Sequence, residues 1–334
     1  MIDQGLPALA RALDPVAMMP VLADAAGAAP IACSAQVLAH KPGQRCAIAY
    51  ELVESDGHLE LVGKLYRRPR LARRVFAWAQ ELSDRTAQHP GARLPEPLAY
   101  VPELGLTLHR RVGGDDLRHA LAAGAASEPL ARSAEWLARL HRSGTLEELR
   151  AKPLEHELAK LERWCVKVRS VLPPSGRTRL ARARRRLVVR ARRLGPRPFA
   201  TIHRDLYYAH VLWDGRDTWL IDLDQLGLGD PALDVGHFLA HLDTLALRTA
   251  GSPGAYRDDG KAFVDAYASS GGLDVEAALP LYRAYTFLKL AATEVDRRGP
   301  AWLEQTQALV ELACAEAKEA ARVGFSGSTA LVRR

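Results

Sequence analysis

Three aspartates within a segment of twenty residues carry the strongest chemical signal in this chain. A His-Arg-Asp sequence, residues 203–205, comes directly after the mainly apolar residues 200–202. Asp222 and Asp224 form a D-x-D pattern further along the chain. If one strand residue separates Asp222 from Asp224, both carboxylates project from the same face. Hard carboxylate oxygens of this kind suit Mg²⁺, which keeps several waters and takes few protein ligands. Beside such a metal site, Asp205 is a candidate to accept the proton of a substrate hydroxyl or to align that hydroxyl.

Phosphoryl transfer is the chemistry that these residues would suit. The reaction asks a protein to position an acceptor hydroxyl, to neutralise a triphosphate and to hold one or two metal ions through oxygen ligands. An isolated D-x-D pattern is a weak signal, but here it follows a His-x-Asp pattern in an apolar frame, residues 200–202 before it and 211–213 after it. The combination favours a catalytic site over a group of surface acids. We expect His203 to orient the loop rather than to transfer protons itself.

The loop from His203 to His210 is similar to the catalytic loop of kinases, H-R-D-x-x-x-x-N, whose asparagine holds a second magnesium ion. His210 stands at the position of that asparagine. An imidazole nitrogen suits zinc, copper or iron better than magnesium. His210 is therefore a candidate metal-site residue with three alternatives: it contacts a metal-bound water or a phosphate, the enzyme works with one metal ion, or the protein binds ligands without turnover.

Residues 202–242 resemble the aminoglycoside phosphotransferase and choline kinase superfamily. The family core reads H-x-D-x-x-x-x-N, then h-D-[FWL]-x, then G-D-P-x-x-D-[LV], and residues 229–235 supply the third part here. The resemblance implies that Asp205 is the catalytic aspartate, that Asp222 is a metal ligand and that Asp224 is an additional one. It also implies ATP or GTP as phosphate donor and Mg²⁺ as metal, with Mn²⁺ as the alternative. Asp234 is similar to a residue that anchors the backbone of the catalytic loop.

The N-terminal part of the chain contains candidate nucleotide contacts. Lys64 lies on a strand predicted over residues 59–66 and matches the lysine that contacts the nucleotide phosphates in kinases. Glu81 is the candidate ion-pair partner of Lys64, or alternatively a solvated helix residue. The turn over residues 41–45 is the candidate phosphate-covering turn, although Gly43 is its single glycine and a G-x-G-x-x-G pattern is missing.

Hydrophobic periodicity predicts an α+β protein, with strands first and helices later in the chain. Together with the resemblance, this order implies a two-lobed, protein-kinase-like fold. The small N-terminal lobe is β-rich, and the larger C-terminal lobe is mainly helical. Strands are expected over 31–40, 45–53 and 59–66, a helix over 69–89, and a strand pair over 98–112. The helices expected further on begin with one that starts at an N-cap Ser127 and ends at His141, followed by a helix pair over 153–194 and helices over most of 232–322. Asp230 and Pro231 are expected to be the N-cap and first residue of a helix.

These elements give three predicted regions. Residues 1–112 form a nucleotide-binding lobe with an N-terminal helical extension, and a hinge lies near 109–114. Residues 113–323 form a helical lobe with the catalytic loop and the acceptor site. Residues 324–334 are expected to be a disordered tail.

Composition restricts the classes of function. Of 334 residues, 48% are hydrophobic and 25% charged, which is ordinary for a globular protein, and no apolar run is long enough to span a bilayer. The start of the chain lacks a signal-peptide pattern. Four widely separated cysteines indicate reduced thiols in a cytoplasmic protein. Ten arginines between 177 and 197 could mark a nucleic-acid surface, but apolar residues recur opposite them, so we expect a solvated helix face and no nucleic-acid partner.

The spacing of the acids favours a small acceptor. Only five residues separate Asp224 from Asp230, which leaves no room for the activation segment on which a protein kinase holds its peptide substrate. The predicted function is transfer of the γ-phosphate of ATP or GTP to a hydroxyl of a small molecule. The alternative is an impaired protein that binds a nucleotide or metabolite without turnover. Asp258, Asp259 and Asp265 would suit a polyamine or aminoglycoside acceptor, or are simply surface acids of a helix. The sequence specifies no oligomeric state.

Overall fold

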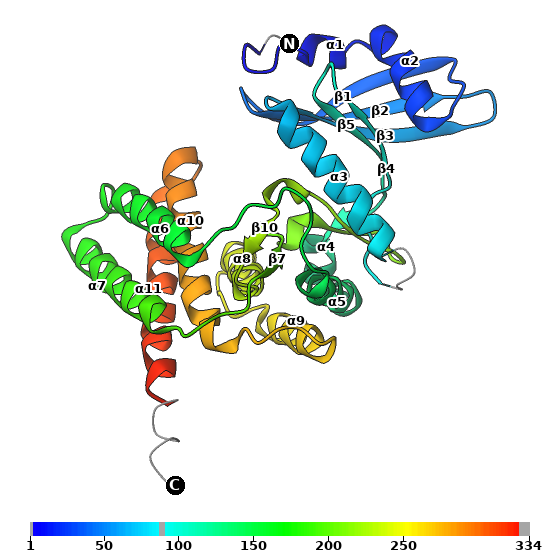
Figure 1. The fold of residues 1–334 in the computed structure, drawn as a ribbon. Coiled ribbons are helices and arrows are strands. Elements are labelled where there is room, and N and C mark those ends of the chain that lie inside the picture. The colour runs from blue at the N-terminus through cyan, green and yellow to red at the C-terminus, as the bar shows by residue number, and fades with distance from the viewer. Residues whose placement is uncertain (1–2, 87–90, 327–334) are drawn as a thin grey trace. The chain divides into compact units, whose positions relative to one another are not determined.

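The computed structural model describes residues 3–86 and 91–326. Their contacts divide the chain into two compact units, each shown with its elements in Figure 1. The first unit takes the described residues of 1–115 together with 146–148 and 212–224. The second takes 116–145, 149–211 and the described residues from 225 onward. The D-x-D segment therefore belongs to the first unit, and the His-x-Asp loop belongs to the second.

A five-stranded antiparallel sheet is the centre of the first unit. Its strand order is β1-β2-β3-β5-β4. The strands are β1 (Ala32–Lys41), β2 (Arg45–Val53), β3 (His58–Tyr66), β4 (Pro97–Val101) and β5 (Leu106–Arg110). The strands predicted over 31–40, 45–53, 59–66 and 98–112 are confirmed.

Helices cover both faces of this sheet (Figure 1). Two short N-terminal helices, α1 (Leu9–Ala12) and α2 (Pro15–Ala26), bury Leu9, Met18 and Leu22 with the side chains of β2. On the other face lies α3 (Pro69–Thr86), which buries Ala72, Val75, Trp78 and Leu82 at helical spacing. The end of the predicted helix 69–89 lies outside the described residues.

The register of the sheet fixes the place of Lys64. On β3, Lys64 pairs with Ala47 of β2 and with Thr107 of β5, so it stands in the middle of the sheet. The neighbouring Gly63 allows this close packing, because a Cβ there would lie 2.6 Å from the Tyr50 ring. The backbone that carries Lys64 is thus held on both sides.

The second unit is mainly helical. Its helices are α4 (Leu117–Ala122), α5 (Ser127–Arg142), α6 (Leu154–Arg169), α7 (Pro174–Arg193), α8 (Ala232–Ala250), α9 (Arg257–Ser269), α10 (Leu279–Arg297) and α11 (Trp302–Ser326). The central element is α10, whose Leu281, Phe287, Leu288 and Ala291 are buried in a core shared with α6, α7 and α11. The predicted helix pair over 153–194 is confirmed as α6 and α7.

Short strands and turns carry the chemical motifs. The strand β7 (Ala200–Ile202) pairs with β10 (Gly227–Gly229), and β8 (Val211–Trp213) and β9 (Thr218–Leu220) form a small sheet of order β6-β8-β9 with β6 (Asp115–Asp116). Single turns of 3₁₀ helix lie at Tyr208–His210 (η1), Leu223–Gln225 (η2) and Glu276–Ala278 (η3).

Both predicted helix starts need correction. The helix α5 begins at Ser127, so Ala126 is its N-cap and no side chain caps it. For α8 the N-cap is Pro231, not Asp230, and the helix begins at Ala232. The Asp230 side chain still accepts a hydrogen bond from the Ala232 N–H at 3.0 Å. It therefore pairs with a free N–H group of the first helical turn, although it precedes the N-cap by one residue.

The remaining sequence predictions concern the surface and the tail. On α7, Leu180, Leu187 and Ala191 are buried opposite the arginines, so the amphipathic pattern is confirmed. The disordered tail predicted over 324–334 is wrong for residues 324–326, which are helical and end α11, and its other residues lie outside the described part of the chain. All four cysteines are free thiols. Among the described residues, no helix has the length and apolar character needed to cross a bilayer.

Candidate active site

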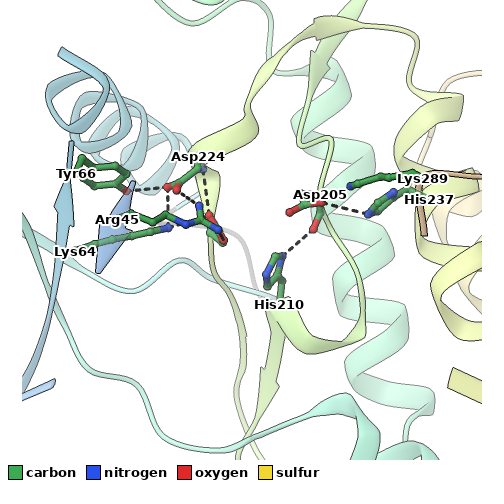
Figure 2. Close-up of polar contacts among 9 residues, drawn as sticks. Arg45, Lys64, Tyr66, Asp205, His210, Asp224, His237 and Lys289 are labelled. Carbon is green, nitrogen blue, oxygen red and sulfur yellow. Dashed lines mark hydrogen bonds and ion pairs between the residues drawn. The ribbon is translucent and has the colours of Figure 1, made fainter. Parts of the chain in front are cut away.

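In the first unit, two carboxylates meet three donors from the sheet (Figure 2). Lys64 Nζ lies 2.9 Å from Asp222 Oδ1 and 2.7 Å from Asp224 Oδ1. Arg45, the first residue of β2, donates a hydrogen bond to Asp224 Oδ2 and lies 3.4 Å from Asp222 Oδ2. The Tyr66 hydroxyl donates to Asp224 Oδ1 at 2.7 Å. The cluster therefore combines two anionic and two cationic side chains.

The backbone of the D-x-D segment differs from the prediction. The strand β9 ends at Leu220, and Leu223–Gln225 form η2, so Asp222 and Asp224 do not flank a strand residue. Asp222 has a φ of 69°, which is uncommon for a residue with a side chain. This left-handed turn, together with a 3.4 Å hydrogen bond from the Asp224 N–H to Asp222 Oδ1, brings both carboxylates to Lys64.

Asp224 and Asp222 differ in their exposure. The Asp224 side chain is 2% exposed and the Asp222 side chain 14% exposed. Burial raises the pKa of Tyr66 well above its usual value, as does the charge of Asp224, so Tyr66 remains a donor. Burial alone would lower the pKa of Arg45, but the charges of Asp222 and Asp224 raise it, so Arg45 stays a cation. Asp224 is thus a buried carboxylate surrounded by donors, and Asp222 is more open to a ligand.

The chemistry of these donors fits magnesium. Mg²⁺ is commonly bound through one or two carboxylates and completes its shell with waters and substrate phosphates. Within residues 3–86 and 91–326, no group of three or more His, Cys, Asp or Glu side chains could hold a metal by itself. Asp222 and Asp224 suit an ion that keeps other ligands, whereas a structural zinc site would need four protein ligands.

In the second unit, Asp234 fixes the backbone of the His-x-Asp loop. Asp234 is fully buried in the first turn of α8, and it accepts hydrogen bonds from the N–H groups of His203 at 2.6 Å and Arg204 at 2.5 Å. His141 Nε2 lies 3.0 Å from the same carboxylate. Burial would raise the pKa of Asp234, but the contacts with His141 and His203 lower it, so the carboxylate is ionised. These bonds hold Arg204 at a φ of 69°.

The Asp205 carboxylate has two partners, Lys289 of α10 and His237 of α8 (Figure 2). Lys289 Nζ lies 2.8 Å from Asp205 Oδ1, and His237 Nε2 lies 3.5 Å from the same oxygen. Burial would raise the pKa of Asp205, but the His237 contact and the Lys289 charge hold it well below its usual value. Burial and the Lys289 charge lower the pKa of His237 to about 4. At neutral pH, Asp205 is therefore an anion and His237 a neutral ring.

The two histidines of the loop support its conformation. His210 Nδ1 lies 2.7 Å from the carbonyl oxygen of Asp205, so its ring N–H donates to the loop backbone, and its ring packs 4.3 Å from that of Tyr207. Any contact of His210 with a metal or phosphate would have to use Nε2. His203 is fully buried with its ring edge-on to Trp136, which suits the predicted orienting role.

The candidate pair Lys64–Glu81 does not form. Glu81 instead accepts a hydrogen bond from Arg85, one turn further along α3, and its side chain is 39% exposed. Because α3 buries the face that contains Trp78 and Leu82, Glu81 is directed to the solvent side. Asp222 and Asp224 take its expected place beside Lys64. The pairing prediction was wrong, and the solvated alternative describes Glu81.

Gly43 lies in the turn between β1 and β2 with a φ of 66°, which favours glycine. Its N–H donates to Asp3 Oδ2 at 2.8 Å, and His40 Nε2 lies 2.8 Å from the same oxygen. The N-terminal segment packs closely here, because a Cβ on Gly5 would lie 2.4 Å from the Gly43 Cα. The predicted phosphate-covering turn is therefore held by Asp3, and its Gly43 amide is already hydrogen-bonded.

Three residues of these clusters were not predicted as site residues: Tyr66, His237 and Lys289. Arg45 belongs to the predicted turn over 41–45 but had no role of its own there. Two of the three had a local signal. Tyr66 is two positions from Lys64 on a strand and so lies on the same face. His237 is three positions from Asp234 on a helix and so lies beside it on the same side of the helix. Lys289 had none, because it is 84 residues from Asp205 in the sequence.

A sheet-rich first unit with a lysine beside a D-x-D turn, and a helical second unit with an anchored H-R-D loop, define a protein-kinase-like fold. Within that class, the chain belongs to the phosphotransferase enzyme family, whose model matches residues 47–279. The resemblance stated from residues 202–242 and the predicted fold class are both confirmed.

Solved structures share this fold at low sequence identity. A choline/ethanolamine kinase family protein from Mesorhizobium loti is 19% identical, with a TM-score of 0.62 over 94% of this chain and 98% of that one. A glucosamine kinase is 17% identical, with a TM-score of 0.60 over 92% and 88%. A thermostable mutant of an aminoglycoside phosphotransferase is 15% identical, with a TM-score of 0.59 over 90% and 99%. No curated protein sequence matches the chain.

The buried histidines of α8 predict that the protein loses stability in mild acid. A histidine in the unfolded chain takes up a proton near pH 6.5. In the folded protein the pKa of His237 is lowered to about 4 and that of His241 well below its usual value, and burial is the main cause for both. Between these pH values the unfolded state binds more protons, so the free energy of unfolding falls as the pH falls. At pH 4 the loss from His237 is on the order of 2–3 kcal/mol.

Urea unfolding of the wild type and of His237→Gln between pH 7 and pH 4 measures this loss. The variant lacks one titrating ring, so its stability should depend less steeply on pH. Equal slopes in the two proteins would contradict the assignment of the effect to His237.

Proposed function

We propose that the protein transfers the γ-phosphate of ATP or GTP to a hydroxyl of a small molecule. The observation that carries this proposal is Asp205, an anionic carboxylate whose side chain is 26% exposed, on a loop whose backbone is fixed by a buried anchor. A loop of this kind holds one carboxylate in a fixed position, where it can contact the hydroxyl of an acceptor.

Asp205 acts mainly by alignment. Because its pKa is held well below the usual range, it is a weak base at neutral pH. The transition state of phosphoryl transfer is loose, so its formation depends more on the position of the acceptor hydroxyl than on early removal of the hydroxyl proton. The acceptor oxygen forms a bond to the γ-phosphorus while the bond to the β,γ-bridging oxygen breaks. The nucleoside diphosphate leaves, and the hydroxyl proton passes to Asp205 or to solvent.

Lys64 and Arg45 are the proposed phosphate contacts of the first unit. Both are cations beside Asp222 and Asp224, and both stand on the sheet at fixed positions. Mg²⁺ would be held by Asp222, with Asp224 as the second carboxylate, and would neutralise charge on the transferred phosphate. A contact of His210 with a metal-bound water or a phosphate would use Nε2, because Nδ1 donates to the Asp205 carbonyl oxygen.

The acceptor is proposed to be small. The five residues between Asp224 and Asp230 include the rest of η2 and the short strand β10, so no long segment follows the carboxylates. The similar structures include proteins described as choline/ethanolamine kinase, glucosamine kinase and aminoglycoside phosphotransferase, whose acceptors are small. Asp258 and Asp265 are exposed on α9, so they do not form a buried acidic pocket for a polycation.

A transfer assay with γ-labelled ATP and GTP against a panel of amino alcohols, sugars and aminoglycosides tests the proposal. We expect a phosphorylated product with Mg²⁺. Removal of the metal by EDTA should lower the rate at least 10²-fold, because Lys64 and Arg45 alone then neutralise the charge of the triphosphate. Parallel reactions with Mn²⁺ show whether His210 alters the metal preference. Nucleotide binding by calorimetry without product under any condition would support the alternative, a binding protein without turnover.

A further inference from the structure

The Asp205 carboxylate is held asymmetrically. Both of its side-chain partners, Lys289 Nζ at 2.8 Å and His237 Nε2 at 3.5 Å, contact Oδ1 (Figure 2). In the described part of the chain, no hydrogen bond or ion pair is made by Oδ2. The side chain is nevertheless 26% exposed, so one oxygen is engaged and the other is accessible.

Lys289 is well placed to hold this oxygen. It projects from the central helix α10, whose neighbouring Leu288 and Phe287 are buried in the core. The Lys289 side chain is itself 31% exposed, and Asp205 is its ion-pair partner among the described residues. A helix that is packed on several sides moves little, so the ammonium has a fixed position relative to α10.

His237 is held in the same way from a second helix. Its side chain is 2% exposed, and its ring centroid lies 4.4 Å from that of His241, with the two rings tilted by 50°. Its Nδ1 lies 3.5 Å from the hydroxyl of the buried Thr286 on α10. A neutral ring that accepts from Thr286 at Nδ1 carries its proton on Nε2. The Nε2–H group then lies 3.5 Å from Asp205 Oδ1, in electrostatic contact with it but without hydrogen-bond geometry.

We propose that Lys289 and His237 are positioning residues that clamp Asp205 Oδ1, so that Oδ2 accepts the hydrogen bond from the acceptor hydroxyl. This inference rests on the proposed function. A hydrogen bond from Lys289 and the electrostatic contact of His237, from two helices, restrain the rotation of the carboxylate about its χ2 angle, a broad and weakly restrained torsion in a free aspartate. The clamp turns a mobile carboxylate into one with a single orientation for the attacking oxygen.

Lys289→Met tests the clamp, with Lys289→Arg as the conservative variant. Lys167→Met is the matched control, because Lys167 makes a comparable ion pair with Asp296 on the surface, with side chains 39% and 61% exposed. Steady-state kinetics should show kcat reduced by about 10²-fold in Lys289→Met, with the KM of the nucleotide within about twofold. Lys289→Arg should recover a large part of kcat, and Lys167→Met should match the wild type.

Thermal unfolding of each variant keeps stability separate from catalysis. A kcat of Lys289→Met equal to that of the wild type would overturn the clamp. So would a fall in kcat that is fully explained by a smaller fraction of folded protein, or a rise in KM without a fall in kcat. Failure of the arginine variant to recover any activity would count against a positional role for the cation. If the wild-type protein itself transfers no phosphate to any acceptor, the proposed function fails first, and the clamp fails with it.

Discussion

Asp205→Asn is expected to reduce kcat by about 10²–10⁴-fold, because it removes the carboxylate that aligns the acceptor hydroxyl. The substitution keeps the shape of the side chain but replaces an anion with a neutral amide. It also leaves the Lys289 ammonium, 2.8 Å away, without its counter-charge. The KM of the nucleotide should change little, since the proposed phosphate contacts are Lys64 and Arg45.

The effect is measured as kcat and KM in the transfer assay, on protein whose folding is checked by circular dichroism. Asp296→Asn is the matched control, because it makes the same chemical change at an ion pair with Lys167 on the surface. The control should keep wild-type kinetics. Undiminished turnover in Asp205→Asn would remove Asp205 from the mechanism.

The sequence predicted the scaffold of the site better than its contacts. Strands β2 and β3 follow from alternation, and α8 follows from helical periodicity, because burial of one face leaves a regular pattern. Lys64, Asp205 and Asp222 were predicted as candidates from their motifs alone. Each of these signals is local, spanning residues that lie close together in the sequence.

The errors arose where a contact joins distant segments or where the backbone is irregular. Glu81 was a candidate partner because it follows Lys64 in the chain, yet the carboxylates beside Lys64 come from residues 222 and 224, nearly 160 positions away. Asp222 was placed on a strand because a positive φ at a non-glycine residue leaves no signal in one sequence. Lys289 belongs to a helix whose sequence pattern indicates amphipathic character but does not indicate which residue contacts Asp205.

Asp234→Asn is expected to lower the free energy of unfolding by about 3–5 kcal/mol, the cost of breaking a buried ionic contact. The Asp234 carboxylate is fully buried and accepts from two backbone N–H groups of the loop and from His141. An asparagine has one acceptor oxygen, and its NH₂ group would face a donor, so at least one buried N–H would lose its partner.

Urea unfolding at pH 7 measures this loss, with Asp296→Asn again as the surface control. The pKa of Asp234 is lowered in the folded state, so its contribution is fully present above the unfolded pKa near 3.9 and is lost only as the pH falls through the lower folded value. The difference between wild type and variant should therefore be constant from pH 5 to pH 7. A loss below about 1 kcal/mol, the net value of one ordinary hydrogen bond, would mean that Asp234 is not the anchor of the loop. Because the Arg204 N–H donates to this anchor at a left-handed φ, we also expect the folded variant to lose kcat, since Asp205 follows directly in the chain.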